Sequence, residues 1–272
     1  MLLAIDVGNT NIVIGVFQGR ELVHSWRLTT IRERTADELG ILVTDLCDHH
    51  GITRQQISGI VIASVVPPLT GTLQAMAVKY FMRTPLLFEP AVNGGMPILY
   101  DNPAEVGADR VVNALAALDQ WGVGKPIIIV DFGTATTFDA ISAKGEYLGG
   151  VICPGPQISA DALFQRAARL PRIEVRKPAR VIGTTTVTSM QSGLFWGYVD
   201  MVEGLVRRMK AELGGEARVV ATGGLAVVMA PESSLIDHVD TELTLQGLRL
   251  VWERRPQMKA ATGEDSHRLD TD

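Results

Sequence analysis

Two stretches of the chain share one pattern of apolar and polar positions. Leu2 to Val16 and Ile127 to Ile141 superpose without a gap: each begins with an apolar run, passes an aspartate and a glycine turn, and ends in a second apolar run. The aspartates Asp6 and Asp131 correspond. A buried strand, a tight turn with glycine and a second β-rich strand form a hairpin, because glycine tolerates the backbone angles of such turns. The pattern therefore predicts the same β-hairpin twice.

Between and after these hairpins, apolar runs with helical spacing alternate with short strand-like runs. We expect helices over residues 36–50, 69–81, 110–121, 160–168, 187–213 and 243–254. We expect further strands over 57–64, 86–89 and 218–222, and a loop rich in glycine and proline over 149–156. Alternation of this kind predicts an α/β fold with helices packed on a central sheet.

The spacing of the two hairpins bears on domain organisation. A repeat of about 125 residues is too long for the roughly 20–50-residue units of solenoid proteins, so it predicts two similar domains with a cleft between them. We expect an N-terminal domain over residues 1–117 and a C-terminal domain over 118–255. Residues 256–272 are mostly polar and cannot bury enough apolar surface to order themselves, which predicts a disordered tail.

Composition and charge narrow the class of protein. Of the 272 residues, 46% are hydrophobic and 20% charged, which is typical of a globular chain. The formal net charge of −5 offers no cationic surplus for nucleic acid or an anionic membrane, and we expect neither partner. Cys47 and Cys153 lack the spacing of a disulfide framework or a zinc site. No targeting or membrane-spanning run is recognisable, so we expect a cytoplasmic protein.

The turn of the first hairpin carries side chains suited to nucleotide phosphates. Asp6 ends a buried strand and precedes a turn with glycine, asparagine and threonine. The N–H groups of such a turn can donate to phosphate oxygens, and the carboxylate can bind magnesium directly or through water. An ordinary hairpin with polar side chains that satisfy its own backbone would have the same composition. The second copy, with Asp131 and its own hydroxyls, favours the nucleotide interpretation.

Familiar nucleotide motifs do not explain the two turns. Asp131-Phe132-Gly133 matches the metal motif of protein kinases, but the lysine strand, catalytic loop and glycine-rich loop of those enzymes are missing from the sequence. The Walker signature and the dinucleotide-binding glycine motif are missing too. A different ATP-binding fold is required.

Several strings of residues are similar to those of a known family. The two hairpins and Ala221-Thr222-Gly223-Gly224 resemble the phosphate and adenosine motifs of the superfamily that contains actin, hexokinase and chaperone ATPases. Within it, the chain resembles the type III pantothenate kinases through strings that follow the family's order: Asp6-Val7-Gly8-Asn9-Thr10-Asn11, Gly107-Ala108-Asp109-Arg110, Asp131-Phe132-Gly133-Thr134-Ala135-Thr136-Thr137, Gly149-Gly150-x-Ile152-x-Pro154-Gly155 and Met190-Gln191-Ser192-Gly193. The family's Gly-Lys-Asn-Thr-Val reads Gly183-Thr184-Thr185-Thr186-Val187 here, with Thr186 retained.

The resemblance implies a fold and an activity. The fold is α/β, with two similar duplicated domains of the actin-like ATPase type and a nucleotide cleft between them. The activity is transfer of the ATP γ-phosphate to the primary hydroxyl of pantothenate, which gives 4'-phosphopantothenate in the first step of coenzyme A biosynthesis. The implied cofactors are magnesium, bound at Asp6, and potassium or ammonium, bound at Asp131.

The resemblance also implies the residues that bind the two substrates. ATP is expected to contact the first hairpin and the second turn: Asp6, Val7, Gly8, Asn9, Thr10, Asn11, Ile12, Val13 and Thr134. Pantothenate is expected to contact a second set: Tyr100, Gly107, Ala108, Asp109, Arg110 and Thr186. Asp109 is the implied acceptor of the hydroxyl proton. Without the resemblance, a helix-capping aspartate followed by a solvated arginine would be the simpler interpretation of Asp109 and Arg110.

Two other functions fit the same fold. Another alcohol or sugar kinase of the superfamily would share the hairpins, although not the Gly-Ala-Asp-Arg string. A regulatory nucleotide-binding protein without activity would share them too, but the presence of Asp6, Asp109 and Asp131 together argues against it. We also expect a homodimer, because the resemblance implies one and because the apolar residues of the helix over 187–213 spread beyond one narrow stripe. These residues are Leu194, Phe195, Trp196, Tyr198 and Met201.

Overall fold

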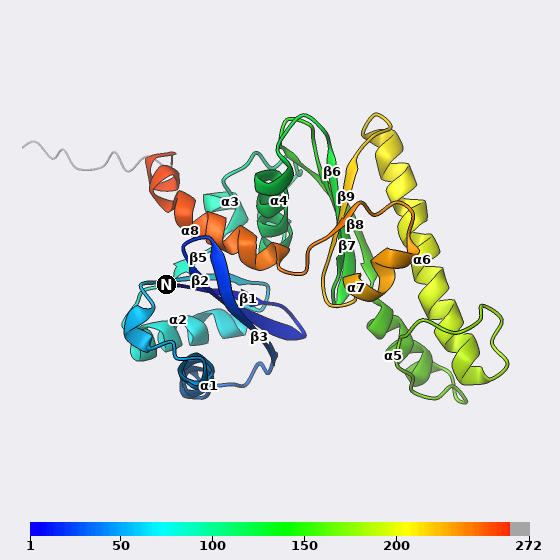
Figure 1. Cartoon of the computed structure of the whole chain (residues 1–272), viewed down its shortest axis with the longest axis horizontal. Coiled ribbons are helices and arrows are strands. Elements are labelled where there is room, and N and C mark those ends of the chain that lie inside the picture. Colours follow the sequence, from blue (N-terminus) through cyan, green and yellow to red (C-terminus); the bar gives the residue numbers. More distant parts are fainter. Residues whose placement is uncertain (262–272) are drawn as a thin grey trace, which may run out of the picture. The chain divides into compact units, whose positions relative to one another are not determined.

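The computed structural model describes residues 1–261, with side chains through Arg255, and this part of the chain forms two compact units (Figure 1). Unit 1 contains Met1–Gly95, Asn102–Val112 and the segment from Leu245, and unit 2 contains Met96–Asp101 and Asn113–Thr244. The division expected after residue 117 follows the internal repeat and stays a prediction. Residues 256–261 of the expected tail are the end of a helix that begins at Leu243, and residues 262–272 lie outside the described residues.

Unit 1 is built on a mixed sheet in the order β3-β2-β1-β4-β5. The strands are β1 Leu2–Val7, β2 Asn11–Gln18, β3 Glu21–Thr29, β4 Gly59–Ser64 and β5 Leu86–Leu87. Neighbours β1, β2 and β3 are antiparallel, whereas β4 pairs parallel to β1 and β5 parallel to β4. The carboxyl ends of β1 and β4 therefore meet at one edge of the sheet, where Val7 pairs with Ser64.

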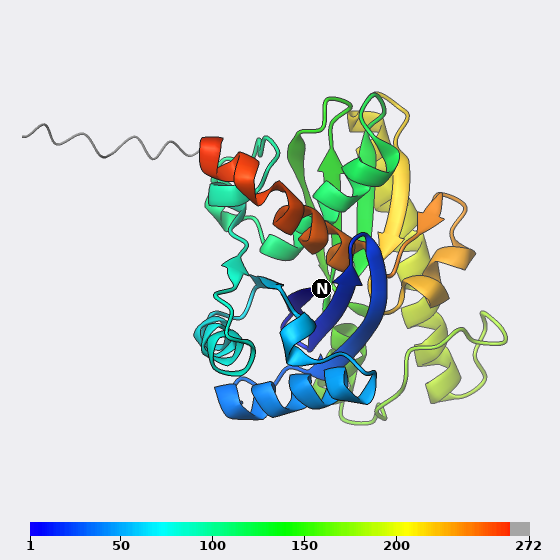
Figure 2. The ribbon, with the colours of Figure 1, turned by 60° about the vertical axis from the view of Figure 1, so that its left-hand side comes forward.

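Helices cover both faces of this sheet. Helices α1 (Ala36–His49) and α2 (Pro67–Phe81) pack on one face and share its apolar core (Figure 2). The start of α1 is fixed by a capping box, in which the Thr35 hydroxyl accepts from the Glu38 N–H and the Glu38 carboxylate accepts from the Thr35 N–H. Helix α8 (Leu243–Ala261) packs on the other face: a Cβ atom on Gly59 would lie 2.1 Å from the Trp252 ring.

Unit 2 repeats this arrangement with the sheet order β10-β9-β6-β7-β8. Its strands are β6 Ile127–Phe132, β7 Ala135–Ile141, β8 Tyr147–Pro154, β9 Arg218–Thr222 and β10 His238–Val239. In both units the first strand lies between its hairpin partner and a later parallel strand. The predicted α/β fold of two similar domains is therefore confirmed.

One long helix dominates the packing of unit 2. Helix α6 (Thr186–Glu212) contributes Phe195, Val202 and Val206 to the core on one face of the sheet, and α5 (Pro156–Arg166) joins it. The remaining helical segments of the described chain are short, apart from α4: α3 Pro90–Asn93, α4 Ala108–Trp121, α7 Ala226–Met229 and the 3-10 turns Arg54–Gln56, Pro103–Glu105 and Ala230–Glu232. No helix within residues 1–261 is long and apolar enough to cross a membrane.

The hairpins and the region of β8 differ from the sequence-based expectations. The hairpins do not superpose without a gap, because Val7 pairs with Ile12 whereas the equivalent Phe132 pairs with Thr136, so the second turn is one residue shorter. The loop expected over 149–156 is also wrong: most of it belongs to β8, and α5 begins at Pro156. Glycine and proline made this strand resemble a loop in the sequence.

Candidate active site

The turn of the first hairpin is closed by backbone hydrogen bonds. The Gly8 N–H donates to the Asn11 carbonyl at 2.9 Å. Thr30, just after β3, makes two further hydrogen bonds to the turn. Its hydroxyl donates to the Gly8 carbonyl at 2.7 Å, and its N–H donates to the Thr10 carbonyl at 2.9 Å. The side chains of Asn9 and Thr10 are exposed at the tip. A tight turn that presents amide and hydroxyl groups at the end of a strand is suited to phosphate binding.

The strand residues beside this turn alternate between core and solvent. Val7 and Ile12 form the last pair of the hairpin and are buried, whereas the preceding pair, Asp6 and Val13, is half-buried. Successive side chains of a strand point to opposite faces, so the Asp6 carboxyl lies on the face opposite Val7. The structure therefore brings the ATP-binding candidates of the first hairpin together in unit 1.

Asp131 holds the equivalent position in the second hairpin, and a buried amide contacts its carboxyl group. Asn113 is fully buried in α4 and donates from Nδ2 to Asp131 Oδ2 at 3.3 Å. The Thr244 hydroxyl donates to Asn113 Oδ1 at 2.7 Å, which fixes the orientation of the amide. Sequence reasoning missed Asn113, although its signal is visible: it is a lone amide among the apolar residues of an amphipathic helix.

Glycines allow backbone to approach the second turn closely. Gly223 has φ +91°, and a Cβ atom there would lie 2.3 Å from Asp131 Oδ1. The Gly155 N–H donates to the Thr134 carbonyl at 3.1 Å, and a Cβ atom on Gly155 would lie 2.2 Å from that oxygen. Side chains at these two positions would displace the carboxyl group and the turn. The two glycines therefore let backbone pack directly against the Asp131 carboxyl group and the Thr134 carbonyl.

Asp109 lies in the first turn of α4 in unit 1. The Gly107 carbonyl accepts from the N–H groups of Arg110 at 3.2 Å and Val111 at 3.4 Å, which starts the helix. The Arg110 N–H also donates to Asp109 Oδ1 at 2.9 Å. A Cβ atom on Gly107 would lie 2.5 Å from the same oxygen, so glycine leaves room for the carboxyl group. The local structure thus explains why the Gly-Ala-Asp-Arg string begins with glycine.

The surroundings of Asp109 alter its acidity. Burial raises the pKa of the Asp109 carboxyl, because desolvation disfavours the charged form. The Arg110 backbone N–H and then the Arg110 charge act in the opposite direction, and the net result is a raised pKa. Asp109 is nevertheless only half-buried, so solvent and substrate can reach it. A reachable carboxylate with a raised pKa is a stronger proton acceptor than an ordinary aspartate.

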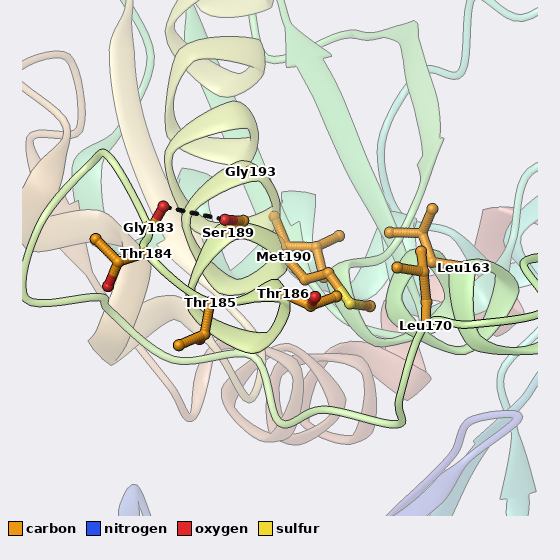
Figure 3. A pocket seen from close by; sticks show the side chains of 10 residues that line it. Leu163, Leu170, Gly183, Thr184, Thr185, Thr186, Ser189, Met190 and Gly193 are labelled. Atoms are coloured by element: carbon orange, nitrogen blue, oxygen red, sulfur yellow. Dashed lines mark hydrogen bonds between the residues drawn. The ribbon is translucent and has the colours of Figure 1, made fainter.

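The other two pantothenate candidates lie in unit 2. The Tyr100 ring packs on Gly149 of β8, where a Cβ atom would lie 3.4 Å from the ring. Thr186 is the first residue of α6 and is exposed, directly after the capping residue Thr185. It lines a groove of about 750 Å³ between the end of α5 and the start of α6 (Figure 3). The Ser189 hydroxyl donates to the Gly183 carbonyl at 3.3 Å and holds the loop that forms one side of this groove (Figure 3).

The candidate residues are divided between the two units. Unit 1 contains the first turn with Asp6, and Asp109 with its neighbours, whereas unit 2 contains Asp131, Thr134, Tyr100 and Thr186. Within residues 1–261, no group of three or more histidine, cysteine, aspartate or glutamate side chains could hold a metal ion.

The chain is similar to known proteins over almost its whole length. A family model described as type III pantothenate kinase matches residues 2–208. The type III pantothenate kinase of Myxococcus xanthus is 57% identical over 254 residues, which cover 93% of this chain and 98% of that protein. The type III pantothenate kinase of Moorella thermoacetica is 56% identical over 254 residues, covering 93% and 99%.

Solved structures with much lower identity share the fold alone. MreB 5 of Spiroplasma citri, solved with bound AMPPNP, has a TM-score of 0.55 and 11% identity, covering 96% of this chain and 98% of that chain. The activator of 2-hydroxyisocaproyl-CoA dehydratase from Clostridium difficile, solved with bound ADPNP, has a TM-score of 0.54 and 14% identity, covering 99% of each. The family model and the two relatives above 50% identity show that the chain belongs to the type III pantothenate kinase family.

Proposed function

We propose that this protein phosphorylates the primary hydroxyl of pantothenate with the γ-phosphate of ATP, giving 4'-phosphopantothenate for coenzyme A synthesis in the cytoplasm. The family match, with relatives above 50% identity across the chain, is the observation that carries this proposal. The local structure agrees with it, because a carboxylate of raised pKa stands at the start of α4 in the Gly-Ala-Asp-Arg string.

In this mechanism the first turn binds the phosphates of ATP. Gly8 keeps the turn tight, and the exposed Asn9 and Thr10 offer donors to phosphate oxygens. Asp6 would bind magnesium, directly or through water. Magnesium is usually held by one or two carboxylates together with substrate phosphates, so a site without a cluster of acidic side chains fits this ion. Thr134 would contact ATP from the second turn.

Asp109 performs the proton step. Its carboxylate accepts the proton of the pantothenate hydroxyl while the hydroxyl oxygen forms its bond to the γ-phosphorus and the bond to ADP breaks. Arg110 and Tyr100 bind and orient pantothenate, and Thr186 adds a hydroxyl. Phosphoryl transfer depends mainly on alignment and on neutralising charge, so these residues act chiefly by position.

Asp131 is the proposed ligand of a monovalent cation, potassium or ammonium. The site fits such an ion, because the carboxyl is held by Asn113 and faces closely packed backbone at Gly223. When bound, the cation would offset part of the negative charge of ATP. The motifs around the two turns contain no lysine that could do the same.

The raised pKa of Asp109 predicts how activity depends on pH. The carboxyl must be deprotonated to accept a proton, so kcat/KM should fall as the pH drops through the raised pKa. The midpoint pH of this acid limb should lie above the ordinary aspartate pKa of about 3.9. A pH profile of kcat/KM for pantothenate measures it, and in Asp109→Asn the residual activity should lack this limb. An unchanged acid limb in that variant would assign the titration to another group.

We further propose a homodimer, although on different residues from those that the sequence suggested. Leu194, Phe195 and Tyr198 of α6 are buried in the core of unit 2, and Trp196 and Met201 are half-buried against it, so none of these five side chains is exposed. Apolar side chains are instead exposed around the groove at the start of α6: Ile182 is 82% exposed, Val181 64% and Phe164 45%. Clustered apolar residues of this kind often mark an interface, and a second copy of this chain is the proposed partner.

Light scattering tests the homodimer. We expect a mass of twice the 29.4 kDa of one chain. Ile182→Asp should shift the protein toward the monomer, because a charge in an apolar interface is desolvated without a partner. Val78→Asp, at a site 51% exposed in unit 1, serves as the matched control and should remain dimeric. A monomeric wild-type protein at working concentration would contradict the proposal.

A panel of acceptor alcohols tests the proposed substrate. ADP release should be rapid with pantothenate and slow with sugars and with other small alcohols. Rapid release with another alcohol alone would favour a different kinase of the superfamily. ATP binding without turnover of any acceptor would favour a regulatory nucleotide-binding protein.

A further inference from the structure

Asp139 is a buried carboxyl group that the mechanism above does not use. It lies in β7 two residues after Thr137, which pairs with Asp131, so Asp139 and Asp131 share one face of the sheet. The Tyr147 hydroxyl donates to Asp139 Oδ1 at 2.7 Å, and the Thr137 hydroxyl lies 3.5 Å from Asp139 Oδ2. Asp139 and Tyr147 are both fully buried. Burying a carboxyl group costs free energy unless the group is hydrogen-bonded, so the core can hold Asp139 only with these hydrogen bonds.

Tyr147 links this carboxyl group to a segment far away in the sequence. As the first residue of β8, it donates its N–H to the Pro97 carbonyl at 2.9 Å and accepts the Leu99 N–H on its own carbonyl at 2.8 Å. Ile98 forms a parallel bridge to it. The phenol thus fixes the side chain of Tyr147 to Asp139, while the backbone of the same residue holds the segment over residues 97–99.

Tyr100 follows this segment directly and packs against β8. Its ring packs on Gly149, two residues after Tyr147, where a Cβ atom would lie 3.4 Å from Cε2 and 3.5 Å from Cδ2. Gly149 has φ +127°, a backbone conformation that other residues rarely adopt. The position of the Tyr100 ring therefore depends on the backbone at the start of β8. The hydrogen bond between Tyr147 and Asp139 fixes this part of the strand.

We propose that Asp139 and Tyr147 are positioning residues for pantothenate: through the backbone of residues 97–99 they hold Tyr100 in the orientation that binds the substrate. This inference rests on the proposed function, because Tyr100 is assigned to pantothenate there. A purely structural pair would stabilise unit 2 without a selective effect on either substrate.

Tyr147→Phe tests the proposal by removing one hydroxyl and keeping the ring. The KM for pantothenate should rise by about 3- to 10-fold, the worth of roughly one hydrogen bond, because the interaction acts on substrate binding. The kcat and the KM for ATP should stay within about twofold. Hydrogen exchange should be faster at the Leu99 amide, whose acceptor is the Tyr147 carbonyl.

A matched variant and a second disruption sharpen this test. Tyr80 also donates from its hydroxyl to a carboxylate, Asp37, at 2.8 Å in unit 1, so Tyr80→Phe removes the same group elsewhere and should leave the pantothenate KM unchanged. Gly149→Ala disturbs the surface of β8 on which the Tyr100 ring packs, and it should reproduce the selective rise in the KM for pantothenate. Assays run well below the melting temperature of each variant, which calorimetry gives.

The outcomes separate this inference from the proposed function. A wild-type pantothenate KM in both Tyr147→Phe and Gly149→Ala would overturn the positioning role, as would equal losses for pantothenate and ATP. If the wild-type protein does not phosphorylate pantothenate, the proposed function and this role both fail. Hydrogen exchange at Leu99 needs no substrate, and an unchanged rate in Tyr147→Phe would overturn the proposed hold on residues 97–99 whatever the activity.

Discussion

Asp109→Asn is expected to lower kcat by roughly 10²–10⁴-fold, the usual worth of a general base. Asparagine keeps the shape of the side chain and can still accept the Arg110 N–H, so the start of α4 should remain intact. It cannot accept the proton of the hydroxyl at neutral pH. Steady-state kinetics with saturating ATP and pantothenate measures the effect, and calorimetry with a non-hydrolysable ATP analogue should show unchanged nucleotide binding.

The control for this variant is a carboxylate outside the candidate site. Asp45 is exposed in α1, and Asp45→Asn should have wild-type kinetics. If Asp109→Asn also turned over at a near-normal rate, Asp109 would have no part in the proton step. Loss of nucleotide binding together with turnover would point to misfolding of unit 1 instead.

Removing potassium and ammonium should lower activity by roughly 10²-fold, since a bound cation can contribute several kcal/mol of charge stabilisation. The assay uses magnesium–ATP in Tris or sodium buffer, with potassium then added in steps. Asp131→Ala should lose the stimulation by potassium, because Asp131 is the one carboxyl group in the motif over residues 131–137. The variant should keep its melting temperature within a few degrees if the turn itself survives.

A surface variant in the same unit completes this experiment. Glu216 forms an exposed salt bridge with Lys125 at 3.4 Å, and Glu216→Gln should keep the full response to potassium. Equal rates in sodium and potassium for the wild-type protein would refute the monovalent site. Stimulation that persisted in Asp131→Ala would move the site to other residues.

Sequence patterns predicted the parts of the fold that depend on local chemistry. Both hairpins, with Asp6 and Asp131 at equivalent positions, follow from apolar runs that end in a glycine turn. Strand β8 could not be predicted in this way. Gly149 and the neighbouring glycine and prolines indicate a loop, but the strand is selected by pairing with β7 and by the ring of Tyr100, which lies on Gly149. Such contacts are set by tertiary structure.

In the candidate site too, the sequence predicts local motifs but not contacts between elements. The strings around Asp109 and Asp131 are recognisable in the sequence, because their chemistry lies in consecutive residues. Asn113 and Tyr147 were not singled out, since each contacts a residue on another element: Asn113 of α4 reaches Asp131 in β6, and Tyr147 of β8 reaches Asp139 in β7. Only the folded chain shows what a lone buried amide or phenol contacts.

Identification of the reaction product tests the proposed activity most directly. Purified protein, magnesium–ATP, potassium and pantothenate are incubated, and the products are separated and identified by mass spectrometry. We predict one new compound with the mass of pantothenate plus one phosphoryl group, formed in equal amount to ADP and roughly 10²–10⁴-fold more slowly with Asp109→Asn. ADP release without this compound, or no consumption of pantothenate by an enzyme that binds ATP, would contradict the assignment.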